Sequence, residues 1–196
     1  MNDSLNDLSN EELWKLFPII ISEHQEKWLQ LYSEEKDKLC LSIGSHNIIR
    51  INHIGSTAVP KLLSKPTIDI LLEIKKDTNL NTLINNIESL GYIFTPQPKN
   101  PSPHMMFMKG YTTEGFKGQA FHIHVRYPGD WDELYFRDYL LFHPQVADKY
   151  GELKLKLKEE HEFNRDAYTY AKTEFVKSIT RLAREEIGHR YKIEEQ

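Results

Sequence analysis

The stretch from His53 to Glu73 combines a glycine-serine turn, a lone lysine before a proline and an aspartate inside an apolar run. Residues Ile48–Ile54 are apolar and β-branched, which predicts a buried strand that ends at Gly55. Glycine allows a tight turn and a close approach of a ligand to the main chain, while the hydroxyl groups of Ser56 and Thr57 can cap a helix. Each of these features could help to hold a phosphate or a metal ion.

A short helix is expected directly after this turn, over residues 59–64. Pro60 suits the first turn of a helix, and Lys65 before Pro66 would end it. A strand, a glycine turn and a helix start together point backbone N–H groups at one spot, which favours an anion, and Lys65 would add an ammonium group. The same pattern also fits an ordinary strand-to-helix connection, so both interpretations stay open.

Asp69 lies in the middle of the next expected strand, Thr67–Ile74. Alternation places Asp69, Leu71 and Glu73 on one face, and four aliphatic residues on the face toward the core. Aspartate is disfavoured in mid-strand, and a half-buried carboxylate needs a metal ion, an arginine or a lysine as its partner. We predict a ligand-binding role, because the glycine-serine turn precedes it. A strand aspartate that faces solvent or pairs with Lys65 is the structural alternative.

Two histidines, His122 and His124, share one face of a further expected strand, residues 120–126. Two imidazoles on one face can bind one metal ion, or grip a phosphate when protonated. Arg126 follows at the same spacing and could meet an anion. Two half-buried histidines without a ligand are the alternative, because a bare His-x-His motif is weak.

Helical spacing and capping signals predict the elements that position these strands. The expected helices cover residues 9–16, 22–43, 78–90, 131–142, 144–160 and 164–186. A short strand is expected over residues 92–94, and residues 105–109 would pair with 120–126 as a hairpin around a polar loop, 110–119. The charges of the run LKLKLK are expected to form a solvated face. In the last helix, Tyr168 and Lys172 lie on one face.

The run HIGSTAVPKLLSKPTIDI resembles the signature of the GrpB-like family, an uncharacterised group with the nucleotidyltransferase fold. The segments FHIHV and FRDYL with FHP, and Tyr168 with Lys172 in YTYAK, extend the resemblance along most of the chain after roughly the first 20 residues. The resemblance implies two metal ions, held by an Asp-x-Asp/Glu strand and by a third acid on a neighbouring strand, that activate a nucleoside triphosphate. It also implies that Tyr168 and Lys172 turn toward the site. Leu71 stands where the second acid would be.

Composition limits the classes of function. A length of 196 residues fits one domain, 1–196, with a disordered tail over residues 1–8. The net charge of -4 argues against general nucleic-acid binding, and the single Cys40 excludes an internal disulfide. The polar, acidic N-terminus and the lack of a long apolar run indicate a cytoplasmic protein without a membrane span.

We therefore expect an α+β fold, with a nucleotidyltransferase-like mixed sheet flanked by helices. The candidate catalytic residues are Asp69, Lys65 and Lys172. The candidates for binding a nucleotide or phosphate are Gly55, Ser56, Thr57, Lys65, Arg126 and Tyr168, and those for a divalent ion (Mg, Mn or Zn) are Asp69, His122 and His124. Metal-assisted nucleotidyl or phosphoryl transfer, a non-catalytic nucleotide- or anion-binding module, and a single-metal hydrolase all stay open, because Leu71 offers no oxygen.

Overall fold

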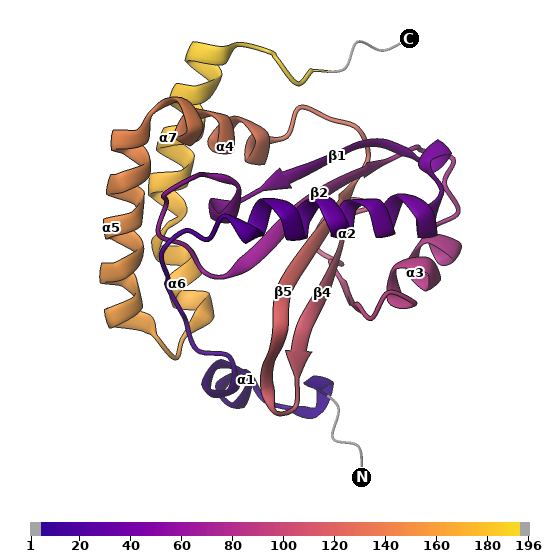
Figure 1. Cartoon of the computed structure of the whole chain (residues 1–196), viewed down its shortest axis with the longest axis horizontal. Coiled ribbons are helices and arrows are strands. Elements are labelled where there is room, and N and C mark those ends of the chain that lie inside the picture. The colour runs from indigo at the N-terminus through magenta and orange to yellow at the C-terminus, as the bar shows by residue number, and fades with distance from the viewer. Residues whose placement is uncertain (1–4, 193–196) are drawn as a thin grey trace.

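A mixed β-sheet lies at the centre of the computed structural model, which describes residues 5–192 (Figure 1). The described strands run in the order β1-β2-β5-β4-β3, and all neighbours are antiparallel except β2 and β5, which are parallel. The strands are β1 Ile48–Ile54, β2 Thr67–Ile74, β3 Ile93–Pro96, β4 Met105–Thr112 and β5 Gly115–Arg126. The parallel pair places the centre of β2 beside the centre of β5.

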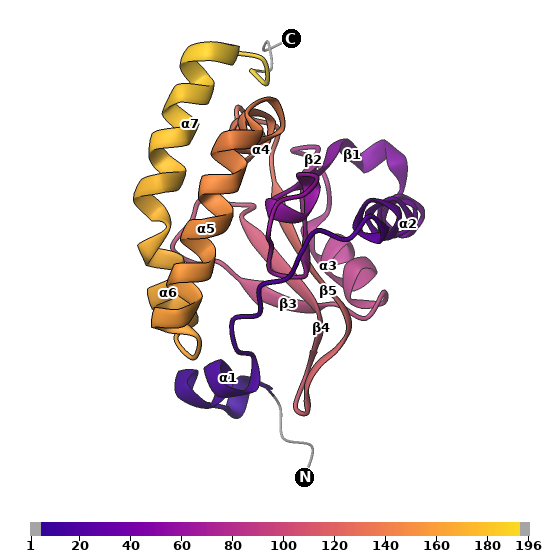
Figure 2. The ribbon, with the colours of Figure 1, turned by 60° about the vertical axis from the view of Figure 1, so that its left-hand side comes forward.

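Helices cover both faces of this sheet (Figure 2). They are α1 Asn10–Leu16, α2 Lys27–Ile43, α3 Leu80–Glu88, α4 Asp132–Phe142, α5 Pro144–His161, α6 Arg165–Ala171 and α7 Thr173–Ile187. In Figure 2, α2 and α3 lie on one side of the sheet, and α5, α6 and α7 form a column on the other side. The predicted α+β single domain with a flanked mixed sheet is confirmed.

The main core lies between the sheet and helices α2 and α3. The aliphatic face of β2 belongs to it, as alternation predicts: Ile68, Ile70, Leu72 and Ile74 are all fully buried there. Trp28 of α2 and Ile87 of α3 contribute from the helix side. The opposite face of β2, which carries Asp69, therefore faces the column of C-terminal helices.

The helix predicted over residues 59–64 is absent. Instead, Ser56–Ala58 form one turn of 3-10 helix. Lys61 adopts a left-handed backbone conformation with φ of 64°, which interrupts a right-handed helix. Ser64 is extended, because its main chain exchanges two hydrogen bonds with Ser22. The predicted α-helix after the turn is therefore wrong, whereas the anion site at Gly55, Ser56 and Lys65 stays a prediction.

Three other elements begin or end at residues that differ from the predicted ones. The expected loop 110–119 is mostly strand, because Gly110 makes a bulge: a Cβ there would lie 2.7 Å from the Gln119 carbonyl oxygen. Helix α2 begins at Lys27 without a side-chain cap, so the expected cap at Ser22 is not formed. The last expected helix is divided into α6 and α7 at Lys172.

The ends of the chain are described only in part. Residues 1–4 of the expected tail lie outside the described residues, whereas Leu5–Asp7 form a 3-10 helix and Leu5 packs near Phe17, so the tail prediction fails for these three residues. No helix among residues 5–192 is long and apolar enough to cross a membrane. The cytoplasmic location stays a prediction.

Candidate functional site

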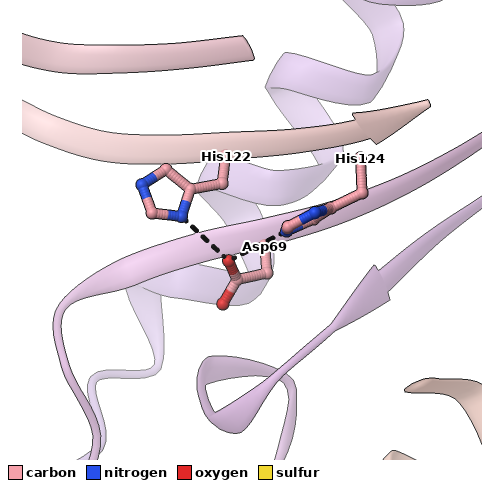
Figure 3. Close-up of side chains that lie close together, drawn as sticks. All are labelled: Asp69, His122 and His124. Carbon is pink, nitrogen blue, oxygen red and sulfur yellow. Dashed lines mark ion pairs between the residues drawn. The ribbon is translucent and has the colours of Figure 1, made fainter. Parts of the chain in front are cut away.

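Asp69 and the two histidines meet on one face of the sheet (Figure 3). The parallel register of β2 and β5 sets Asp69 directly beside His122, and Leu71 beside His124. His122 Nδ1 lies 3.3 Å and His124 Nε2 lies 3.6 Å from the same oxygen, Asp69 Oδ1. One donor atom from each of the three residues lies within 4.8 Å of the others. Period-two alternation in two neighbouring strands is enough to bring them together.

The donor set suits a divalent ion that accepts both oxygen and nitrogen ligands. Burial lowers the pKa of His122, so its imidazole is neutral near pH 7 and offers a lone pair. The Tyr111 hydroxyl lies 2.8 Å from His122 Nε2, which fixes the ring with Nδ1 toward Asp69. Burial alone would raise the pKa of Asp69, but the contacts with the two imidazoles outweigh it and hold that pKa below its ordinary value.

Gly55 is required beside this carboxylate. Its φ is 70°, in the left-handed region that favours glycine, and a Cβ added there would lie 2.5 Å from Asp69 Oδ2. Antiparallel pairing of Ile54 with Asp69 causes this proximity, because Gly55 is the next residue along the chain. Any side chain at position 55 would displace the carboxylate that the two histidines contact.

Ser56 meets a buried lysine from a distant part of the chain. Lys154 Nζ, on α5, donates a hydrogen bond of 2.9 Å to Ser56 Oγ. Lys154 is only 2% exposed, and its ammonium group also lies 4.5 Å from the centre of the Tyr150 ring. The expectation that the charges of LKLKLK form a solvated face is therefore wrong for Lys154, since α5 turns this residue into the protein.

Two more lysines flank the Tyr168 ring. Lys172 Nζ lies 4.3 Å and Lys65 Nζ 5.6 Å from the ring centre. The Tyr168 hydroxyl is fully buried and has no hydrogen-bond partner within residues 5–192. Among the described residues, no carboxylate forms an ion pair with Lys65, Lys154 or Lys172. Buried polar groups normally have partners, so this group of side chains is a candidate ligand site.

Burial dominates the ionisation of the three lysines, and Asp69 only partly offsets it for Lys65 and Lys172. Burial lowers the pKa of Lys65 to about 7, of Lys172 to about 8 and of Lys154 to about 6. Repulsion between the cations adds to the effect: Lys172 acts on both of the other lysines, and Arg165 acts on Lys65 and Lys172. An anion bound beside Lys65 and Lys172 would offset the repulsion between the cations.

These side chains line one cavity of about 440 Å³. Its wall includes Gly55, Ser56, Lys65, Asp69, His122, Tyr150, Lys154, Arg165, Tyr168 and Lys172. A second cavity, of about 700 Å³, shares Gly55, Asp69 and Phe136 with it and continues past His124 to Asp130, Asp132, Glu133 and Arg184. We call the first cavity, which the lysines line, the basic cavity, and the second one is mainly acidic. Asp69 lies at the border between the two.

Two predicted binding residues lie elsewhere. Thr57 is fully buried; its hydroxyl donates to the Thr67 carbonyl oxygen at 3.1 Å and lies 2.9 Å from His53 Nε2, so it holds the turn in shape. Arg126 donates to the carbonyl oxygen of Val125 and lies over the Trp131 ring, outside the residues that line either cavity.

Leu71 fills the place of the second acid with core packing. It is fully buried against Ile54 and against Leu134 of α4. Glu73, the next residue on that face, is also buried. Arg50 donates a hydrogen bond of 2.6 Å to each of its carboxylate oxygens. Neither residue can share an ion with Asp69.

Sequence analysis did not find Lys154, Tyr150 or Arg165. A signal for Lys154 was present: the buried positions of α5 are Ala147, Tyr150, Gly151, Lys154 and Leu157, which places a lysine inside the apolar stripe of a helix. Arg165 opens α6, where its guanidinium donates to the Phe17 carbonyl oxygen at 3.1 Å. Its role depends on contacts across 148 residues of sequence, which no local pattern encodes.

Comparison with known proteins shows which family the chain belongs to. The family model described as GrpB protein matches residues 18–182. The chain belongs to the GrpB family. Glutamate-rich protein GrpB of Alkalihalophilus pseudofirmus is 32% identical over 165 residues, 82% of this chain and 93% of that protein. UPF0157 protein YqkA of Bacillus subtilis is 32% identical over 82% of this chain, and PA4798 of Pseudomonas aeruginosa is 37% identical over 78%. The match spans only 46% and 62% of the length of these two relatives.

Solved structures show the same fold. The crystal structure of conserved protein GrpB from Enterococcus faecalis superposes with a TM-score of 0.75 and 30% identity, over 86% of this chain and 99% of that one. The Cid1 poly(U) polymerase, in a structure with MgGTP bound, has a TM-score of 0.51 and 12% identity over 83% of this chain and 52% of its own. This GrpB-family chain therefore has a nucleotidyltransferase-like fold.

Proposed function

We propose that this chain binds a nucleotide or a related phosphorylated ligand in the basic cavity and supports metal-assisted phosphoryl or nucleotidyl transfer. One observation carries the proposal: Lys65, Lys154 and Lys172, which form no ion pair with a carboxylate among the described residues, gather in one cavity with Asp69 and His122. Ammonium groups held in a cavity without ion-pair partners are costly, and a polyphosphate would supply the counter-charge. The buried Tyr168 hydroxyl, which has no partner, would donate a further hydrogen bond to that ligand.

Asp69, His122 and His124 would hold one divalent ion (Mg, Mn or Zn), and the donor set favours zinc or a similar ion over magnesium. Such an ion would supply Lewis-acid polarisation of a phosphoryl oxygen. Lys65 and Lys172 would neutralise the negative charge that develops during transfer, which is the main contribution of a protein to phosphoryl chemistry. Ser56 would orient the phosphate that lies nearest Lys154.

The Leu71 position limits the chemistry to a single ion. Two-metal transfer needs ions roughly 3.5–4 Å apart, bridged by neighbouring carboxylates. Leu71 is packed in the core and Glu73 is held by Arg50. We therefore expect weak or absent magnesium-dependent nucleotidyl transfer, with ligand binding retained. The same observation favours a non-catalytic binding module as the second candidate.

Calorimetric titration with ATP and manganese tests the binding. We expect one ion and one nucleotide per chain, with metal uptake lost in Asp69→Asn and nucleotide affinity reduced at least tenfold in Lys65→Met. Lys156→Met is the matched control, because Lys156 lies on the surface of α5, with its side chain 73% exposed. Failure of the wild-type chain to bind ATP and inorganic triphosphate would refute the proposal.

A transfer assay separates the two candidates. Each labelled triphosphate is incubated with the protein and with RNA, protein or small-hydroxyl acceptors, in magnesium or manganese. Robust nucleotidyl transfer that disappears in Asp69→Asn would refute the expected loss of two-metal chemistry. Binding without transfer of any kind would favour the binding module.

A further inference from the structure

Ser56 and Lys154 form a pair that the binding of phosphate does not require. Ser56 Oγ and Lys154 Nζ lie 2.9 Å apart, and both residues line the basic cavity together with Gly55 and Asp69. Lys154 is buried to 2% exposure, and its amino group is hydrogen-bonded to the serine hydroxyl.

The burial of Lys154 changes what its amino group can do. It packs against the Tyr150 ring and has no carboxylate partner among the described residues. A buried amine without a counter-charge favours the neutral form, and the pKa of Lys154 falls to about 6. In that form the nitrogen carries a lone pair, so the hydrogen bond reverses and the Ser56 hydroxyl donates to Nζ. A neutral amine in contact with a hydroxyl group is the arrangement of a general base with its nucleophile.

We propose that Ser56 is a nucleophile, activated by Lys154, that accepts the terminal phosphoryl group of a nucleoside triphosphate and becomes phosphoserine. This inference rests on the nucleotide binding proposed above. The terminal phosphate carries the most negative charge of the chain of phosphates, so it fits best beside the ammonium groups of Lys65 and Lys172, in the cavity that Ser56 also lines.

The step balances without any further reagent. Ser56 Oγ forms a bond to the terminal phosphorus, and its proton passes to Lys154 Nζ. The bond between that phosphorus and the bridging oxygen breaks, and the nucleoside diphosphate leaves with the electron pair. Lys65 and Lys172 then face the charge that develops on the bridging oxygen, and Lys154, now an ammonium group, pairs with the new phosphoserine.

The experiment uses the full chain with ATP labelled at either the terminal or the α-phosphate, in manganese, and locates any adduct by peptide mass spectrometry. We expect the terminal label on Ser56 in the wild-type chain and in the surface control Lys156→Met, and none in Ser56→Ala. Label from the α-position on Ser56 would overturn the assignment of the terminal phosphorus. No adduct despite ATP binding, measured by thermal shift on the same sample, would overturn the proposal and leave the binding function standing. No ATP binding would overturn both.

Two substitutions of Lys154 test its role as a base. Lys154→Met removes the amine, and Lys154→Arg keeps a donor and a positive charge but cannot accept a proton. General-base catalysis contributes about 10²–10⁴-fold, so we expect the rate of Ser56 labelling to fall about 100-fold or more in both variants. A labelling rate in Lys154→Arg within about threefold of wild type would show that only the charge matters and would overturn the base assignment. Thermal unfolding of each variant confirms that it is folded.

Discussion

Replacement of the buried Lys154 by methionine should change how the stability of the protein depends on pH. Burial, reinforced by repulsion from Lys172 and Lys65, lowers the pKa of Lys154 to about 6 from an ordinary value of 10.5. Between these two values the unfolded chain holds a proton on this lysine that the folded chain does not. Stability therefore rises with pH through this window, and this stabilisation is lost as the pH falls toward 6.

The size of the effect follows from the shift. One proton of difference gives a slope of about 1.4 kcal/mol per pH unit, and at pH 7 the deprotonation of Lys154 costs folding on the order of 5 kcal/mol. Methionine has a similar length and carries no proton, so Lys154→Met removes both the slope and this cost. The loss of the hydrogen bond to Ser56 offsets part of the gain. We expect Lys154→Met to be about 1–4 kcal/mol more stable than wild type at neutral pH.

Urea unfolding at several pH values between the two pKa values measures this directly. The wild-type chain, Lys154→Met and the surface control Lys156→Met are compared. Lys65 and Lys172 contribute equally to all three slopes, so the difference between Lys154→Met and wild type isolates Lys154. Equal slopes in these two proteins would refute the reasoning, because they would mean that Lys154 stays protonated in the folded state.

Three further predictions concern the site itself. Gly55→Ala should lower metal affinity at least tenfold and destabilise the fold by about 1–3 kcal/mol, because its Cβ would collide with Asp69 and its φ is positive, as titration and thermal unfolding would show. Tyr111→Phe removes the hydroxyl that orients His122 and should weaken metal binding about 10–100-fold in the same titration, whereas an unchanged affinity would mean that the hydroxyl does not orient the ring. Leu71→Asp should not create a second ion site but should cost more than about 3 kcal/mol in urea unfolding, since it buries a carboxylate in the core; full stability with two bound ions would contradict this.

The sequence predicted what depends on local periodicity. Alternation along two strands located the face of Asp69 and the shared face of His122 and His124, and the geometry of the sheet then brought them together. Leu71 was recognised as a missing acid, but its burial against α4 was not, because that contact depends on tertiary packing.

The basic half of the site was predicted only in part for the same reason. Lys65 and Lys172 were selected as candidates, but Lys154 was assigned to the solvent, because a lysine in an alternating run of leucine and lysine reads locally as a surface residue. Its partner Ser56 is 98 residues away. The helix predicted after the glycine-serine turn does not form, because the backbone of Lys61 adopts a left-handed conformation. Sequence propensity does not indicate this conformation for lysine.

A crystal structure with manganese and a non-hydrolysable ATP analogue, with the ion located by its anomalous signal, tests the central claim most directly. The account predicts one ion bound by Asp69, His122 and His124, and phosphates in contact with Lys65, Lys154 and Lys172. Two ions side by side at Asp69, or a nucleotide bound outside the basic cavity, would contradict it.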